Sequence, residues 1–184
     1  GVGDGEGEGS PWRTEGKNSQ GGRYRPLAEG NTTTGSRLGP RWIYQTSVGG
    51  NHETTPLVFG GMMYVTSPSN HAYALDLLTG KQIWHYHKDP PAGLNLCCGQ
   101  PNRGFAALGD RLFKVNVEAT LVALAARSGA VLWERQLAGY TKGFTATGSP
   151  LFVKHKVPVA TAGQVFGTGA AVDHYQHASG APAG

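Results

Sequence analysis

Residues 74–84 read ALDLLTGKQIW. The same frame returns as ALAARSGAVLW at 123–133 and as HYQHASGAPAG at 174–184, where Gly184 stands in place of the tryptophan. The three copies share one glycine, at Gly80, Gly129 and Gly180, so the spacings are 49 and 51 residues. Repeats near 50 residues that contain strand hairpins are typical of β-propeller blades, each of which buries its hydrophobic face only against a neighbour. The pattern therefore predicts a propeller in which each tryptophan packs between two blades.

Short β-prone runs separated by glycine-containing turns surround these copies, as expected for successive hairpins. The predicted strands are Pro56–Phe59, Met62–Thr66, Ala72–Asp76 and Gln82–Tyr86 in the first blade, Ala106–Leu108, Arg111–Val115, Thr120–Leu124 and Val131–Trp133 in the second, and Gly148–Val153 with Val157–Ala160 at the start of the third. The chain is thus predicted to be all-β, a partial β-propeller of about three blades, each built from four antiparallel strands.

The predicted blades also set the domain organisation. Three blades cannot close a ring, because propellers typically have about four to eight. We therefore expect residues 11–184 to be the amino-terminal part of a single, larger propeller domain. Residues 1–10, GVGDGEGEGS, are expected to form a disordered tail because they are polar and of low complexity.

Composition and charge exclude some classes of function. The chain has a formal net charge of +4, from 16 Lys and Arg against 12 Asp and Glu. The basic residues are scattered and lack the interleaved aromatics of single-strand nucleic-acid platforms, so no nucleic-acid partner is expected. No apolar run approaches the roughly 18 residues of a membrane helix, and no signal peptide is visible.

The two cysteines lie side by side in LNLCCGQPNRG, residues 94–104. Adjacent cysteines make a poor metal clamp, because zinc ligands are usually spaced further apart. A disulfide between Cys97 and Cys98 would close a small, strained ring, and strained bridges tend to be labile or functional. Two reduced, buried thiols remain the ordinary alternative.

The run from Cys97 to Gly104, Cys-Cys-Gly-x-x-Asn-Arg-Gly, resembles the signature of the quinoprotein alcohol dehydrogenases. This is the methanol and ethanol dehydrogenase family, which uses pyrroloquinoline quinone (PQQ), and the resemblance extends from about Trp12 to Gly180. It implies an eight-bladed ring of which this chain is the N-terminal part. It also implies a Cys97–Cys98 disulfide stacked on one face of the quinone, with Arg103 at the polar edge of the cofactor.

Two further cofactor-binding residues follow from the resemblance. Glu53 stands where the family has a glutamate touching the rim of the quinone, and Thr147 matches a threonine that hydrogen-bonds a PQQ carboxylate. Taken singly, Glu53 could be a solvated loop charge, Arg103 a surface ion-pair partner and Thr147 a turn residue. Their joint occurrence at the family spacing favours a cofactor site.

The metal position departs from the family. Where the family has a glutamate that ligates calcium, eighteen residues after the threonine, this chain has Val165. A valine cannot ligate a hard cation, and the neighbouring Gln164 is a weak, uncharged substitute. The catalytic aspartate base is expected beyond Gly184, so no catalytic residue is assigned here.

His85 and His87 form a separate candidate pair. Their spacing of two places both imidazoles on one face of a predicted strand, an arrangement that could suit a metal. The sequence offers no evident third ligand nearby. We therefore interpret the pair as a solvated strand end.

The resemblance implies oxidation of primary alcohols to aldehydes by hydride transfer to PQQ, with Ca²⁺, or a lanthanide in some relatives, as Lewis acid. It further implies a cytochrome c-type electron acceptor and a periplasmic location, and it is compatible with peripheral membrane association. Residues 1–184 alone are expected to be inactive. The alternative is a non-catalytic propeller scaffold or protein-interaction module, although a scaffold has no need of a strained cysteine ring.

Overall fold

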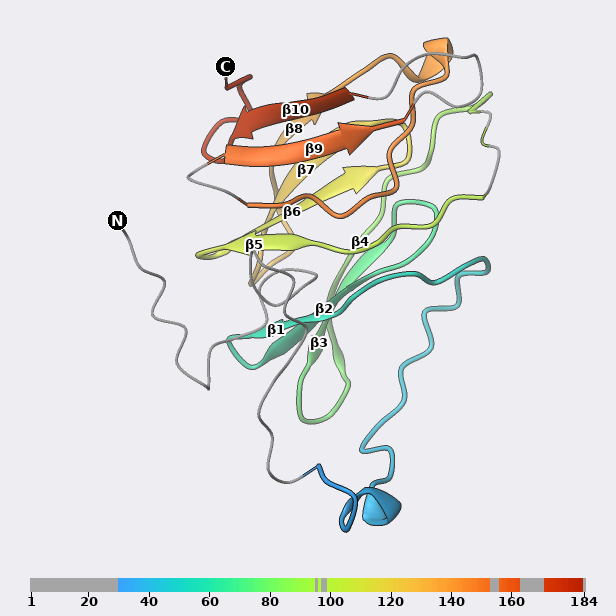
Figure 1. Ribbon diagram of the computed structural model, residues 1–184, viewed down its shortest axis with the longest axis vertical. Helices are drawn as coiled ribbons and strands as arrows, with labels where there is room; N and C mark the ends of the chain where they lie inside the picture. The colour runs from blue at the N-terminus through green and yellow to red at the C-terminus, as the bar shows by residue number, and fades with distance from the viewer. Residues whose placement is uncertain (1–29, 95, 97–98, 153–155, 163–170, 184) are drawn as a thin grey trace.

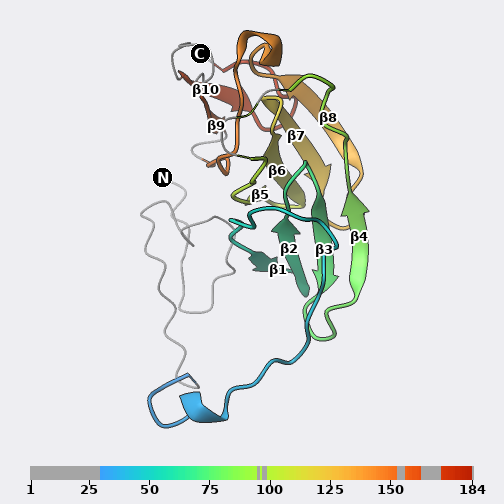
Figure 2. The same ribbon diagram turned by 90° about the vertical axis from the view of Figure 1, so that its right-hand side faces the viewer.

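The computed structural model describes residues 30–94, 96, 99–152, 156–162 and 171–183 of the 184-residue chain. Two four-stranded sheets and a strand pair are stacked one after another along the long axis (Figures 1 and 2). The elements are η1 (Gly35–Arg37), β1 (Leu57–Phe59), β2 (Met62–Thr66), β3 (Ala72–Asp76), β4 (Gln82–Tyr86), β5 (Ala106–Leu108), β6 (Arg111–Asn116), β7 (Thr120–Ala125), β8 (Val131–Gln136), η2 (Tyr140–Lys142), β9 (Lys156–Thr161) and β10 (Ala171–Gln176).

Each strand pairs antiparallel with the next one in the chain, which gives the orders β1-β2-β3-β4 and β5-β6-β7-β8 and the pair β9-β10. The β1–β2 hairpin turns at Gly60-Gly61, where both residues have positive φ, +59° and +76°. A two-residue hairpin of this kind needs residues that tolerate the left-handed region, which explains the two glycines. The prediction of an all-β chain with four-stranded antiparallel blades is confirmed.

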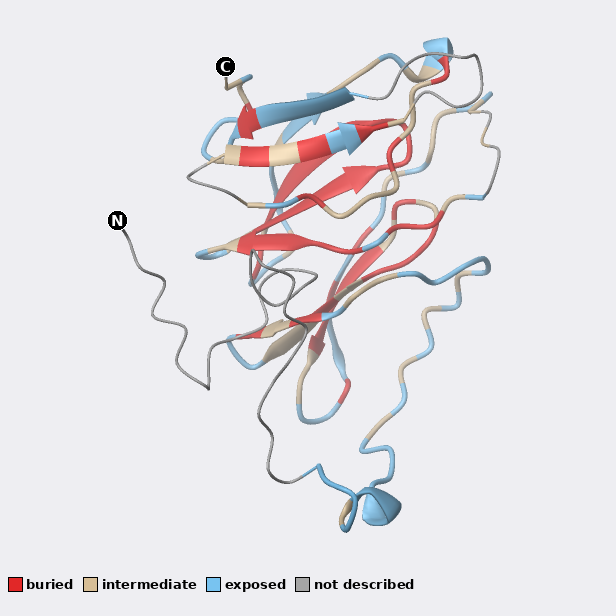
Figure 3. Ribbon diagram, in the orientation of Figure 1, coloured by how far each residue is buried: buried red, intermediate tan, exposed pale blue. Residues whose placement is uncertain are grey.

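The hydrophobic core lies between the sheets, as the red segments of Figure 3 show. Neighbouring residues of β6 serve different cores: Leu112 packs with Trp84 in the cluster shared with the first sheet. Phe113 belongs to the cluster shared with β9 and β10. Because successive side chains of a strand point to opposite faces, β6 and its neighbour β7 are buried on both sides, whereas β8 is largely exposed.

The tryptophans pack against glycines of the following repeat. The indole Nε1 of Trp84 donates to the carbonyl of Ala126 at 2.8 Å, and a Cβ added to Gly129 would lie 2.7 Å from Cδ2 of that ring. The same two contacts recur around two other rings, Trp42 with Leu77 and Gly80, and Trp133 with His177 and Gly180. Each indole therefore fills a space that only a glycine leaves open.

The third repeat differs from its prediction. Residues 148–152, expected to begin a strand, contain none, and the strand that follows is β9, from Lys156. One bond links the two segments, from the amide of Leu151 to the carbonyl of Pro158 at 3.2 Å. Pro158 has no N–H, so it cannot return the bond that it accepts from Leu151, and the pairing is incomplete there. Among the described residues, no helix has the length and apolar character needed to cross a membrane.

Candidate functional site

The loops that lead into β1, β5 and β9 meet through their backbones. The amide of Thr55 donates to the carbonyl of Arg103 at 3.3 Å, and Thr55 forms a parallel bridge with Gly104. The amide of Arg103 in turn donates to the carbonyl of Thr147 at 3.0 Å. Three loops from three successive repeats are thus tied side by side, with Arg103 in the middle.

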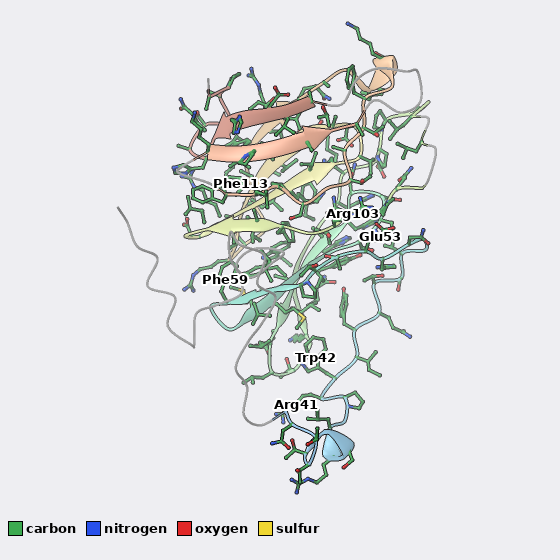
Figure 4. All side chains as sticks on the ribbon, in the orientation of Figure 1. Arg41, Trp42, Glu53, Phe59, Arg103 and Phe113 are labelled. Carbon is green, nitrogen blue, oxygen red and sulfur yellow. The ribbon has the colours of Figure 1, made fainter. Side chains whose placement is uncertain are left out.

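The side chain of Arg103 joins the same three loops. Its Nη2 lies 2.8 Å from Oε2 of Glu53, and its Nη1 donates to Oγ1 of Thr147 at 2.7 Å. Figure 4 shows Glu53 and Arg103 close together beside the sheets. The exposed fractions of the Arg103 and Glu53 side chains are 45% and 37%, so a ligand can reach them from solvent. The structure therefore brings together the three described residues that the sequence assigned to cofactor binding.

The remaining predicted site residues lie outside the described residues. These are Cys97 and Cys98 with their proposed disulfide, and Gln164 and Val165 at the expected metal position. Their roles stay predictions, as does the predicted tail at residues 1–10.

Two residues that support the site were assigned no role from sequence. The hydroxyl of Thr54 accepts hydrogen bonds from the amide and the hydroxyl of Thr66, at 3.2 and 2.9 Å, which ties the Glu53 loop to the end of β2. Asn102 is 1% exposed and its side chain bonds to the backbone on both sides. Asn102 belongs to the Asn-Arg-Gly run, so the sequence did contain a signal for it, but only the arginine was interpreted.

A second polar cluster is fully buried between the first two sheets. The ammonium of Lys114 contacts Oδ1 of Asn116, lies 3.4 Å from the carbonyl of Asn70 and sits 5.2 Å from the ring centroid of Tyr86. Burial lowers the pKa of Lys114 to about 7, and Glu118 is the first of the groups that oppose this shift. The carboxylate of Glu118 accepts a hydrogen bond from the side-chain Nδ2 of Asn70 at 2.8 Å. These bonds hold the two blades together around polar groups that would otherwise be unpaired.

The histidine pair has a third member that the sequence did not indicate. Nδ1 of His71 lies 2.8 Å from Nε2 of His85, and the rings of His71 and His87 are stacked with centroids 3.8 Å apart. The β2–β3 loop carries His71 beside β4, so a third ring joins the pair, while His85 and His87 are exposed, as expected for a solvated strand end. Still, among the described residues no three His, Cys, Asp or Glu side chains are arranged to hold a metal ion.

This histidine cluster predicts that the protein loses stability in mild acid. Burial is the main cause that lowers the pKa of His71 from 6.5 to about 4, and burial also lowers the pKa of His85. Smaller effects on His71 come from charged neighbours, with His87, His85 and Lys114 lowering its pKa and Asp89 raising it. Between these two pKa values the unfolded chain binds up to about one more proton at His71, so stability falls as pH falls.

Urea unfolding at a series of pH values measures this effect. The free energy of unfolding is expected to drop from pH 6.5 toward pH 4, and His71→Gln should make that slope shallower. Above pH 7.5, where both states hold neutral histidine, the variant and the wild type should respond to pH alike. An unchanged slope in His71→Gln would show that other groups control acid sensitivity.

Comparison with known proteins places this geometry in a family. Residues 12–181 match the family described as PQQ: glucose/ethanol/alcohol dehydrogenase, β-propeller domain. The chain belongs to this family. It is 39% identical over 162 residues to a 1-butanol dehydrogenase (cytochrome c) of Thauera butanivorans, which covers 86% of the chain and 23% of that protein.

Two alcohol-oxidising dehydrogenases are also similar to the chain. A lanthanide-dependent methanol dehydrogenase of Methylacidiphilum fumariolicum is 38% identical over 175 residues, covering 92% of the chain and 29% of that protein. The structure of a europium-containing methanol dehydrogenase superposes with a TM-score of 0.89 at 36% identity, over 95% of this chain and 32% of that one. The chain thus spans from 23% to 32% of the length of these relatives.

Proposed function

We propose that this chain forms one wall of a PQQ site in an enzyme that oxidises primary alcohols to aldehydes. The observation that carries the proposal is the bridge made by Arg103, which links Glu53 at 2.8 Å and Thr147 at 2.7 Å across three blades. A planar guanidinium presents parallel N–H donors that suit carboxylate and carbonyl oxygens. Family membership supports the reaction class.

The donors of these residues fit such a cofactor. PQQ carries carboxylates and quinone oxygens, which are acceptors, and Arg103 and Thr147 offer a half-exposed guanidinium and a hydroxyl on adjoining loops. In our proposal Arg103 and Thr147 bind and orient the polar edge of the cofactor. Glu53 lies at the rim of the quinone and holds the Arg103 guanidinium in place. The Cys97–Cys98 disulfide would cover one face of the ring. When bound, PQQ supplies the hydride acceptor.

The metal position is where this chain departs from its family. Ca²⁺, or a lanthanide as named for two of the similar proteins, would act as Lewis acid. Val165 offers no ligand at the position where the family has a glutamate, and Gln164 brings an oxygen without charge. We therefore expect weaker metal binding than in a site with that carboxylate.

The wider setting is part of the same proposal. We propose that residues 11–184 belong to one quinoprotein propeller whose later blades supply the aspartate base, and that electrons pass to a cytochrome c-type acceptor. A similar protein is named for such an acceptor. A periplasmic location follows from the same reading, since a vicinal disulfide needs an oxidising compartment.

Titration of the full-length protein with PQQ tests the proposal directly. Tryptophan fluorescence, followed with and without Ca²⁺ or La³⁺, should report saturable binding that the metal strengthens only modestly. Alcohol-dependent dye reduction should then appear in the PQQ-loaded protein. Failure of PQQ to bind under every metal condition would favour the non-catalytic scaffold instead.

Residues 1–184 expressed alone should show no alcohol-dependent dye reduction, even with PQQ and Ca²⁺. The proposed base lies beyond Gly184, and loss of a general base typically costs about 10²–10⁴-fold in rate. Measurable turnover by these residues alone would contradict the proposed placement of the base.

A further inference from the structure

The side chain of Asn102 encloses the backbone of Arg103. Its Nδ2 donates to the carbonyl of Val115 on β6 at 2.7 Å, and its Oδ1 accepts from the amide of Gly104 at 3.1 Å. The side chain is buried, with 1% exposure for the residue. A carboxamide that bonds the amide two residues later fixes the turn between them, and here the residue in that turn is Arg103.

Neighbouring backbone and side-chain groups also constrain this turn. The carbonyl of Asn102 accepts from the hydroxyl of Thr66 at 3.4 Å, which links it to the first blade. Gly104 has a φ of +122°, and a Cβ there would lie 3.0 Å from the carbonyl oxygen of Thr55. The main chain of Arg103 is therefore held on both sides, and the carboxamide of Asn102 bonds across the turn itself.

We propose that Asn102 is a positioning residue for the cofactor site: its carboxamide anchors the Arg103 turn to β6, so that the guanidinium reaches Glu53 and Thr147 together. This inference rests on the proposed function. Asn102 does not touch the cofactor in this proposal, because it is buried beneath the loop. It acts by fixing the position of the Arg103 backbone, from which the guanidinium extends.

Asn70 provides a matched control at the same boundary between blades. It is also fully buried, and its Oδ1 accepts from the amide of Val117 at 2.8 Å. Its Nδ2 donates to Glu118 at 2.8 Å and to the carbonyl of Lys88 at 3.2 Å. Loss of either carboxamide leaves buried groups unpaired, but only Asn102 has Arg103 in its turn.

Asn102→Ala, Asn102→Ser and Asn70→Ala in the full-length protein test the proposal. Asn102→Ala should weaken PQQ binding about tenfold to a hundredfold, the range for losing an orienting contact behind a ligand-binding group. Asn102→Ser keeps a hydroxyl that can accept from Gly104, so it should recover part of the affinity. Asn70→Ala should lower the thermal midpoint similarly, yet leave PQQ affinity within about threefold, because none of the Asn70 side-chain hydrogen bonds lies in the Arg103 turn.

Hydrogen–deuterium exchange without PQQ separates this proposal from the proposed function. Amides of residues 103–105 should exchange faster in Asn102→Ala than in wild type, and at the wild-type rate in Asn70→Ala. If wild-type protein binds no PQQ, the proposed function fails while the exchange result still tests the anchor. Equal loss of PQQ affinity in the two alanine variants, or unchanged exchange at residues 103–105 in Asn102→Ala, would overturn the positioning role.

Discussion

Replacing Arg103 with alanine is expected to weaken PQQ binding by about a hundredfold or more. Each hydrogen bond to a charged group contributes roughly 1.5–3 kcal/mol. The guanidinium of Arg103 makes two polar contacts in the structure, with Glu53 and Thr147, so it has at least two N–H groups placed for hydrogen bonding at this site. Arg103→Lys keeps the charge but loses the planar fork, so it should recover only part of the binding. Equilibrium titration with PQQ in the presence of Ca²⁺ measures both variants.

Arg127→Ala is the matched control for this prediction. Arg127 is exposed in the β7–β8 turn, so its removal changes the net charge by the same amount. If the effect of Arg103 were only long-range attraction of an anionic cofactor, both variants would lose affinity alike and the loss would vanish in high salt. PQQ affinity within threefold of wild type in Arg103→Ala would rule out Arg103 as a principal cofactor contact.

The positions that form the blades could be read from the sequence because each follows a local rule. The Gly60-Gly61 turn needs positive φ at both residues, and the glycine of each repeat leaves space for an indole. Residues 148–152, where a strand was expected to begin, contain none for a reason that is also local. Pro158 lacks the N–H that would return the bond from Leu151, and the prediction weighed the apolar pattern above this missing donor.

The candidate site was predictable in part. Glu53, Arg103 and Thr147 were named from the resemblance, and the structure places Glu53 and Thr147 each within hydrogen-bond distance of Arg103; their cofactor roles remain proposals. The role of Asn102 was missed because the sequence does not show whether an asparagine side chain is exposed in a turn or buried and bonded to another strand.

The buried polar groups are the clearest limit of sequence reading. Lys114 alternates with apolar residues on β6 and reads as a solvent-facing position, yet it is fully buried against the first blade. His71 lies fourteen residues before His85 and meets it only because β3 and β4 pair antiparallel. Such contacts depend on how blades and strands are placed, which a local pattern does not specify.

Gly129→Ala is expected to destabilise the protein by about 3 kcal/mol. Gly129 has a φ of +72°, and a side chain in that region costs roughly 1–2 kcal/mol. The new Cβ would also lie 2.7 Å from Cδ2 and 2.8 Å from Cε3 of Trp84, so the ring must move. Overpacking of this kind costs about 1–3 kcal/mol, and displacement threatens the bond from Trp84 to Ala126.

Gly60→Ala isolates the contribution of the indole. Gly60 has a φ of +59°, but an added Cβ there meets no atom within 4 Å, so this variant carries the backbone cost without the collision. Urea unfolding followed by circular dichroism should give Gly129→Ala a clearly lower midpoint urea concentration than Gly60→Ala. Trp84→Phe should also be destabilised, because it loses part of the buried indole volume and the N–H donor, but less than Gly129→Ala because it keeps an aromatic ring against the glycine. If Gly129→Ala and Gly60→Ala unfold at the same urea concentration, then the tryptophan does not depend on the space that Gly129 leaves, and the packing of successive blades must have another origin.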